Sequence, residues 1–215
     1  MKRLFVLLLL AAGLTISSHA AFAGCPSSSE PYPGPAWNGP TYRLVSIGGC
    51  DVGILYCWRM EGGNIHYFIN SVVPRVLGCP SMTPDQLIKA AINAFESDPP
   101  LSTSIGPCGD GLPTTVILYT THVCWVKYFA NGSELGDPFD PMQAYRGFQG
   151  CEGNSSCTKT IEYCQDLSTG AINQISETSS EQYDGSCTPA PEIADPWTGW
   201  IVATCYDIDP CNRSQ

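Results

Sequence analysis

Charged residues are scarce in this sequence of 215 residues, and basic residues are scarcer than acidic ones. Asp, Glu, Lys and Arg together make up 14% of the chain, whereas about 25% is typical of soluble domains. Lys and Arg number 10 against 20 for Asp and Glu, and no basic cluster follows Lys2 and Arg3. Because proteins hold phosphate groups mainly through Lys and Arg, nucleic acid and anionic lipid are excluded as partners.

Residue patterns that indicate catalysis are also few. The chain has three histidines, and it contains no G-x-S-x-G motif, which would mark a serine nucleophile. His122 stands two residues before Cys124, on the same face of a regular strand, but Cys124 is expected to form a disulfide in an oxidising compartment. The sequence therefore predicts no catalytic residue, with His122 as a half-buried strand residue and His66 on the solvent side.

Metal-binding spacings are missing as well. Zinc sites use thiolates and histidines at spacings such as C-x-x-C, whereas the closest cysteines here are six residues apart, as in Cys151 and Cys157. We expect no cofactor, and a structural calcium ion bound by loop carboxylates is the minor alternative. Two pairs of aspartates carry that alternative, neither with the spacing of an EF-hand: Asp137 with Asp140, and Asp207 with Asp209.

The longest apolar run lies at the N-terminus and is typical of an export signal. Lys2 and Arg3 precede an apolar stretch over residues 4–14, and Ala21-Phe22-Ala23 has the small-x-small pattern of a cleavage site. The apolar stretch of about eleven residues is shorter than the roughly 20 needed to cross a bilayer. We therefore expect residues 1–23 to be removed and the mature chain, which begins at Gly24, to be secreted or extracellular.

A second interpretation of this region is lipidation. Phe22-Ala23-Gly24-Cys25 resembles a lipobox, which would place a lipid on Cys25 and anchor the protein to the cell surface. Phenylalanine is a poor first residue for such a box, and the polar run over residues 15–19 separates it from the apolar stretch. Plain secretion is favoured, and it leaves a mature net charge of 8 minus 20, or −12.

Cysteine, by contrast, is abundant. An even number of cysteines in an exported protein indicates disulfides, here up to six, whose connectivity does not follow from the spacing. Cys25, close to the mature N-terminus, is the hardest to pair within the chain, and an intermolecular bond is open to it. The disulfide candidates are all twelve cysteines: Cys25, Cys50, Cys57, Cys79, Cys108, Cys124, Cys151, Cys157, Cys164, Cys187, Cys205 and Cys211.

One pattern, Cys-x3-Ile-x-Tyr-Cys-x5-Gly-x-Ile, occurs twice, in residues 50–79 and 157–187. In each copy, turn residues separate two β-rich segments, which predicts a hairpin. The two cysteines of the first strand are seven positions apart, so they lie on opposite faces and should bond different partners. Internal duplication is favoured over chance similarity in a cysteine-rich β protein.

A single helix is predicted over residues 84–97. Thr83 and Gln86 form a capping box around Pro84, and an apolar stripe ending at Phe95 should cover one face of a sheet. Residues 24–40 are rich in Pro, Ser and Gly, which predicts an extended tail, with Trp37 packing its end onto the domain. Further strands are expected at 42–47, 114–129 and 201–206.

Two other features have alternative interpretations. Trp197, Trp200 and Tyr206 could form an aromatic face that binds sugar, although core packing is the favoured use. Three N-glycosylation sequons matter only in a eukaryotic secretory pathway. These sequons begin at Asn131, Asn154 and Asn212.

The sequence thus predicts a mainly β domain over residues 41–215, with one helix, disulfide-stapled antiparallel hairpins and an internal duplication. We interpret it as a secreted, non-enzymatic surface, matrix or binding protein, with a role as a subunit of an extracellular assembly. Its partners would be an extracellular protein, a glycan or further copies of itself. The alternatives are a secreted hydrolase that acts on glycans through paired carboxylates, and a secreted inhibitor or toxin-like module.

The first prediction concerns the mass of the exported protein. We expect a monomer that begins at Gly24 and is lighter by twelve hydrogens than its fully reduced form, because all twelve cysteines would be paired. Intact mass spectrometry before and after reduction and alkylation measures this difference. A lipid mass on Cys25, or a covalent multimer that reductant releases, would contradict it.

Overall fold

The computed structural model describes most of the chain from residue 24 onward. The described residues are 24–26, 32–75, 82–100, 105–109, 111–131, 144–151, 155–182, 185, 187–189, 205–208 and 211. Within them, the backbone alone is described at 127–131, 144–146, 188, 189 and 206.

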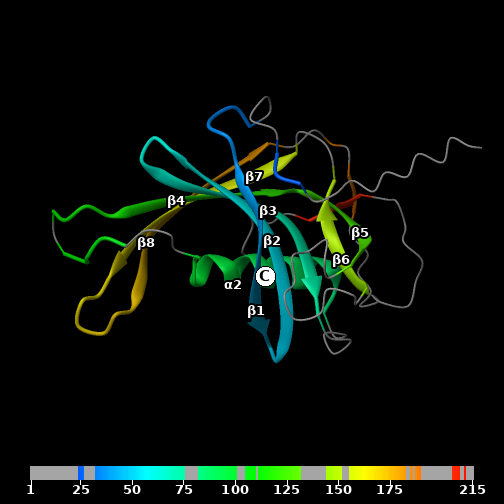
Figure 1. Ribbon diagram of the computed structural model, residues 1–215, viewed down its shortest axis with the longest axis horizontal. Helices are drawn as coiled ribbons and strands as arrows, with labels where there is room; N and C mark the ends of the chain where they lie inside the picture. The colour runs from blue at the N-terminus through cyan, green and yellow to red at the C-terminus, as the bar shows by residue number, and fades with distance from the viewer. Residues whose placement is uncertain are drawn as a thin grey trace, which may run out of the picture.

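Strands dominate the described residues, with one helix among them (Figure 1). The mainly β fold with a single helix and disulfide-stapled hairpins is therefore confirmed. The elements are β1 Asn38–Ile47, β2 Cys50–Glu61, β3 Asn64–Pro74, α2 Pro84–Ser97, β4 Thr115–His122, β5 Cys124–Asn131, β6 Ala144–Gly150, β7 Ser156–Gln165, β8 Ile172–Gln182, β9 Thr188–Pro189 and β10 Tyr206–Asp207.

The strands form one mixed sheet that branches at β3. β2 pairs with one edge of β3, while the other edge is shared by β4, which is parallel, and β6, which is antiparallel. One branch continues from β4 through β7 to β8, and the other from β6 through β5 and β10 to β9. The predicted strand over 114–129 is divided at Val123, so that β4 follows the first branch and β5 the second.

The parallel pair of β3 and β4 was not predicted from the sequence. Two parallel strands require a long crossover connection, which is most often a helix. Helix α2 lies between β3 and β4 in the sequence and so forms part of this crossover. It runs beneath the sheet in Figure 1.

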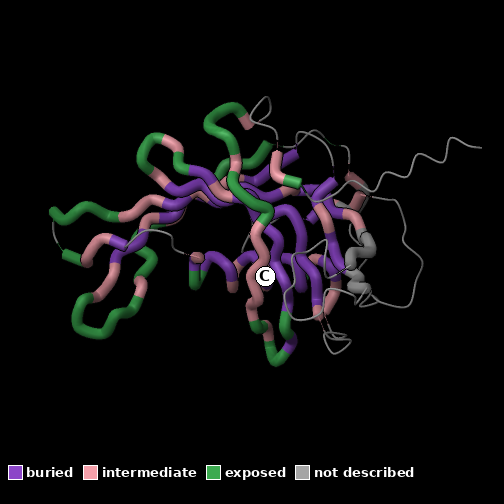
Figure 2. Tube along the Cα trace, in the orientation of Figure 1, coloured by how far each residue is buried: buried purple, intermediate pink, exposed green. Residues whose placement is uncertain are grey.

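Helix α2 begins where the sequence predicts. The Thr83 side chain accepts a hydrogen bond from the Gln86 N–H, and the Gln86 side chain accepts one from the Thr83 N–H, which completes the capping box. The apolar stripe from Leu87 to Phe95 is buried against the sheet. The Phe95 ring makes edge-to-face contacts with three tyrosine rings: Tyr56, Tyr67 and Tyr119. The core therefore lies between α2 and the central strands, which Figure 2 shows as buried.

The two copies of the repeated motif both form antiparallel hairpins, although two residues connect β2 to β3 and six connect β7 to β8. In β2–β3 the register shifts between Leu55 and Tyr56, and in β7–β8 it shifts at the equivalent place, between Glu162 and Tyr163. A shared β-bulge at one position is a specific feature that chance similarity does not explain. It supports duplication, although the return strands differ by two residues: Cys57 lies opposite Phe68, whereas Cys164 lies opposite Asn173.

Disulfides tie the sheet to the segments around it. In each hairpin the two cysteines of the first strand use different partners: Cys157 bonds Cys211, and Cys164 bonds Cys108. Cys50 is also disulfide-bonded, whereas Cys79 lies outside the described residues. The other described disulfides are Cys25–Cys57, Cys124–Cys187 and Cys151–Cys205.

A buried ion pair joins α2 to β7. The Lys159 Nζ atom lies 3.0 Å from Glu96 Oε1 and 3.2 Å from Glu96 Oε2, and the two side chains are 1% and 2% exposed. The Tyr163 hydroxyl donates to the Glu96 carbonyl at 2.8 Å. Because neither charge can reach water, each depends on the other.

The second prediction tests this pair. Lys159→Met should lower the free energy of unfolding by about 3–5 kcal/mol, because it leaves the Glu96 carboxylate buried without its counter-charge. The double variant Lys159→Met/Glu96→Met should recover most of that loss, because it removes both charges. Denaturant unfolding with the disulfides intact measures the difference. Equal stability of the single and double variants would contradict the argument.

Candidate functional site

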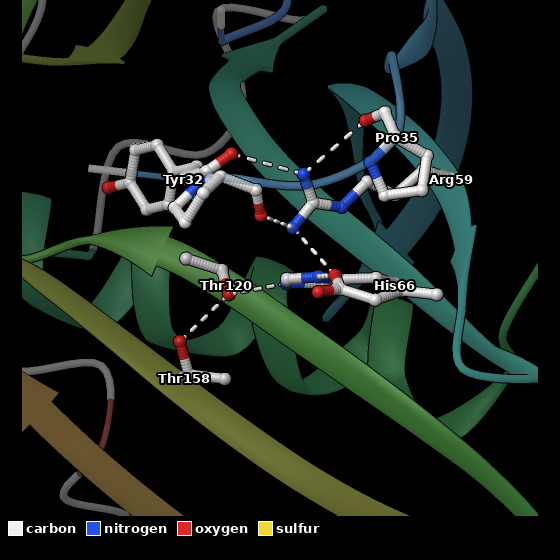
Figure 3. Close-up of polar contacts among 8 residues, drawn as sticks. Tyr32, Pro35, Arg59, His66, Thr120 and Thr158 are labelled. Atoms are coloured by element: carbon white, nitrogen blue, oxygen red, sulfur yellow. Dashed lines mark hydrogen bonds and ion pairs between the residues drawn. The ribbon is translucent and has the colours of Figure 1, made fainter. Parts of the chain in front are cut away.

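The side of the sheet opposite α2 carries a cluster of polar residues that are covered by the segment preceding β1. We call Arg59, Glu61, His66, Thr120 and Thr158 the Arg59 cluster, and residues 24–26 and 32–37 the N-terminal strap. β2, β3, β4 and β7 each contribute to the cluster, and all five side chains lie on the same face because strand residues alternate between faces. In Figure 3, His66, Thr120 and Thr158 lie below Tyr32, and Arg59 lies beside Pro35.

The N-terminal strap lies on the sheet in its described residues. Cys25 is bonded to Cys57 of β2, and the Asn70 side chain donates to the Gly24 carbonyl at 2.7 Å. The Tyr32 ring meets the Phe68 ring edge-on, with their centroids 4.8 Å apart. Since its sulfur is already bonded to that of Cys57, Cys25 has no thiol left to accept a lipid in this structure.

Arg59 is the residue that binds the strap most directly. Its Nη atoms donate to the Tyr32 and Pro33 carbonyls, each at 3.1 Å, and its guanidinium lies 4.2 Å from the centre of the Trp37 ring (Figure 3). Proline-rich segments have few N–H groups but as many carbonyls as any other chain. The fixed fork of Arg59 donors satisfies these carbonyls, and the same guanidinium contacts Glu61 Oε2 at 2.6 Å.

His66 connects Glu61, the ion-pair partner of Arg59, to Thr120 and through it to Thr158. His66 Nδ1 lies 3.2 Å from Glu61 Oε2, and His66 Nε2 lies 2.8 Å from Thr120 Oγ1. Thr120 Oγ1 lies 2.8 Å from Thr158 Oγ1, so the chain of contacts that starts at Glu61 joins four strands: β2, β3, β4 and β7. Trp37 packs edge-on against the His66 ring from the strap side, with centroids 4.9 Å apart.

The pKa shifts of this group define its proton positions. Burial lowers the pKa of His66, and the positive charge of Arg59 adds to this, against the opposing hydrogen bond with Glu61. Burial alone would raise the pKa of Glu61, but the hydrogen bond with His66 and the charge of Arg59 hold it below its usual value. At neutral pH, Nδ1 of a neutral His66 therefore donates to the Glu61 carboxylate, and Nε2 accepts from the Thr120 hydroxyl. Thr158 then donates to Thr120.

The order carboxylate, histidine, hydroxyl is the order used by hydrolases that activate a hydroxyl nucleophile. In those enzymes the hydroxyl is open to the substrate. Here Thr120 is 1% exposed and its oxygen already contacts Thr158. In this conformation the cluster joins strands to the strap, and substrate has no approach to Thr120.

His66 was predicted on the solvent side, and this prediction is wrong. His66 is 7% exposed, because the strap covers this face of the sheet. In the repeated sequence pattern Asn173 occupies the position of His66, but in the structure the return strand β8 is shifted by two residues relative to β3. Asn173 therefore stands at the place of Phe68.

His122 is half-buried, as predicted, at the point where β4 ends. Its ring meets Phe68 edge-on with centroids 5.0 Å apart, and it lies so close to Gly150 that a Cβ there would stand 1.8 Å from its Cδ2. Burial lowers the pKa of His122 to about 4. Cys124 bonds Cys187, so it supplies no thiol to His122.

Most of the other candidates named from the sequence lie outside the described residues. Asp207 is half-buried in β10, whereas Asp137, Asp140 and Asp209 lie outside the described residues. Residues 197, 200, 154 and 212 also lie outside, and only the backbone is described at 206 and 131. Over the ranges that the structure covers, no three His, Cys, Asp or Glu residues are grouped as metal ligands.

The fold and this cluster define a disulfide-stapled, mainly β domain whose second face is sealed by its own N-terminal segment. No family of known proteins, no curated protein and no solved structure matches the chain. Among the described helices, none is long and apolar enough to cross a membrane.

The third prediction follows from His122. Its pKa is about 6.5 in the unfolded chain and about 4 in the folded protein, so the unfolded state binds the proton first as pH falls. Stability is therefore complete above pH 6.5 and decreases below it, by about 2 kcal/mol between pH 6.5 and 5 from this residue alone.

Urea unfolding at pH 7.5, 6.5 and 5 would show this decrease in the wild type and a flatter dependence in His122→Phe, which keeps an aromatic ring. The range above pH 5 avoids the titration of most carboxylates, and pH 7.5 provides the reference at which His122 is uncharged in both states. The same slope in both proteins would contradict the assignment.

Proposed function

We propose that this protein is a secreted, non-enzymatic component of an extracellular surface or matrix and acts by binding other macromolecules. Its disulfides support an extracellular role, because such bonds persist in oxidising compartments and are rare in the cytosol. The five described bonds span 32 to 63 residues of sequence. Each would stabilise the fold by about 3–5 kcal/mol on the chain-entropy model.

The observation that carries the proposal is that the N-terminal strap covers the Arg59 cluster except at Glu61, whose side chain is 41% exposed. His66 and Thr120 are held between the sheet and the strap, and the Cys25–Cys57 bond ties that strap to β2. The hydrogen bonds of the cluster rigidify this part of the structure, although Arg59 Nε has no hydrogen-bond partner among the described residues. The groups left for contact with other molecules are the strand edges and loops.

One observation favours a second candidate. The order of Glu61, His66 and Thr120 would suit a hydrolase whose Thr120 becomes accessible when the strap moves away. The variant Thr120→Val distinguishes the two candidates, since it removes the hydroxyl and keeps the shape of the side chain.

The fourth prediction is that labelled mature protein binds saturably to intact cells or extracellular material of the producing culture, and that Thr120→Val binds within about twofold of the wild type, a difference of less than 0.5 kcal/mol. Circular dichroism and a count of the remaining thiols establish that the variant is folded. Reduced and alkylated protein serves as the unfolded control. Absence of binding, together with an esterase or peptidase activity that Thr120→Val abolishes, would replace the proposal with the hydrolase.

A further inference from the structure

Six strands of the sheet follow one another without a break, in the order β1–β2–β3–β4–β7–β8. In the described part of the chain, β1 and β8 are the outer strands of this run, and each pairs with a single neighbour. They contain 10 and 11 residues. Because β1 and β3 are both antiparallel to β2, and β4 and β8 are both antiparallel to β7, the parallel pair of β3 and β4 makes β1 and β8 point in the same direction.

β8 is the more open of the two edges. Nine of its residues are exposed and two are half-buried, and Figure 2 shows the strand as largely exposed. Because strand residues alternate between faces, both faces of β8 are open to solvent. Protected edge strands usually carry Pro, Lys or a bulge in the middle of the edge. β8 contains no Pro or Lys, its bulge lies near one end, at Ile175, and that side chain is 51% exposed. Such an edge can accept another strand.

Backbone geometry shows which N–H groups face outward. The two-residue turn at Gly48 and Gly49 makes Ile47 and Cys50 a hydrogen-bonded pair. Since such pairs alternate along an antiparallel ladder, the N–H groups of Tyr42, Leu44 and Ser46 point away from β2.

In β7, the Gln165 N–H donates to the Gly106 carbonyl and so points away from β8. Hydrogen-bonded pairs alternate along β7 as well. The N–H groups of β8 that bond to β7 are therefore those of residues 176, 178 and 180. The N–H groups at 177, 179 and 181 of β8 point outward.

The charges of the two edges are complementary. Arg43 is the only charged residue of β1, whereas Glu177 and Glu181 are the only ones of β8. The Arg43 side chain lies over the Phe95 ring of α2. Glu177 stands opposite the core residue Ile161 in the β7–β8 ladder, and side chains opposite each other point to the same face. Both charged side chains are therefore on the α2 side of the sheet. If the β8 edges of two molecules paired, glutamates would face glutamates. If β8 of one molecule paired with β1 of another, the glutamates of β8 would face Arg43 of β1.

These charges have modest strength. Arg43 already forms an ion pair with Asp98, and Gln174 donates to Glu177. An exposed ion pair contributes about 0–1 kcal/mol. The charges therefore select which edges meet, while backbone hydrogen bonds and buried area supply the affinity.

We propose that β8 of one copy of the protein pairs, in parallel, with β1 of the next copy and so continues the sheet from molecule to molecule. This inference rests on the proposed function as an extracellular component and specifies its partner as the chain itself. Contact between two different edges is heterologous, so it leaves a free β1 at one end and a free β8 at the other. The result is an open chain of molecules rather than a closed dimer.

The fifth prediction uses two matched serines, one on each edge. Ser46 and Ser179 are exposed, and by the alternation above their N–H groups point outward. Ser46→Pro and Ser179→Pro each remove one outward donor and spare the pairing with β2 or β7. Ser46→Ala and Ser179→Ala, which keep the N–H, are the controls. Sedimentation velocity over a range of concentrations measures the assembly.

The wild type and both alanine variants should form a concentration-dependent series of oligomers, and each proline variant alone should remain monomeric. An equimolar mixture of the two proline variants should form a dimer and nothing larger, because Ser46→Pro retains β8 and Ser179→Pro retains β1. This result also shows that both variants are folded.

Two outcomes overturn the inference. A wild type that stays monomeric at every concentration excludes self-assembly, and dimerisation of Ser46→Pro alone would mean that two β8 edges pair. Binding of labelled monomer to cells or extracellular material is measured separately. If that binding persists while self-assembly fails, the proposed function stands and only the identity of the partner is wrong.

Discussion

The constraint on which the structure depends is that β3 must be covered on both faces. All of its residues from Ile65 to Pro74 are buried, which is typical of a central strand in a sheet with layers on both sides. Helix α2 supplies one layer through an apolar stripe. The N-terminal strap supplies the other with two aromatic rings, one disulfide and the carbonyls that Arg59 binds. Without the strap, Phe68 and His66 would face water.

The two layers are held by different physical means. Beneath α2 the contacts are mainly apolar, and the ion pair of Glu96 and Lys159 is isolated from water, unlike the ion pair of Arg43 and Asp98 on the same side. On the strap side, polar groups dominate, and a chain of hydrogen bonds runs from Thr158 through Thr120 and His66 to Glu61. Directional bonds select one alignment of strands, whereas apolar burial tolerates several. The polar layer therefore contributes to the register of β3, β4 and β7.

Local features of the sequence predicted the elements, and long-range features were missed. The capping box at Thr83 and the apolar stripe up to Phe95 are complete within a short segment, so the helix was predicted with its observed bounds. The repeated spacing of cysteines predicted both hairpins. The burial of His66 could not be predicted, because it depends on a segment about 30 residues away that has no apolar periodicity. Arg59 is the one basic residue of β2, but its partners on the strap are backbone carbonyls, which every residue has, so the sequence carries no signal of this contact.

The connectivity of the cysteines bears on how the chain is made. Each described disulfide skips at least one intervening cysteine: Cys25 bonds Cys57 across Cys50, and Cys108 bonds Cys164 across three others. A chain that crosses a membrane from its N-terminus presents its cysteines in order, so oxidation as they emerge would join neighbours first. If neighbouring cysteines bond first, the native set is reached only by exchange between thiolates and wrong disulfides, which takes minutes to hours without a catalyst. A connectivity of this kind makes disulfide exchange a slow step of folding, which an isomerase shortens.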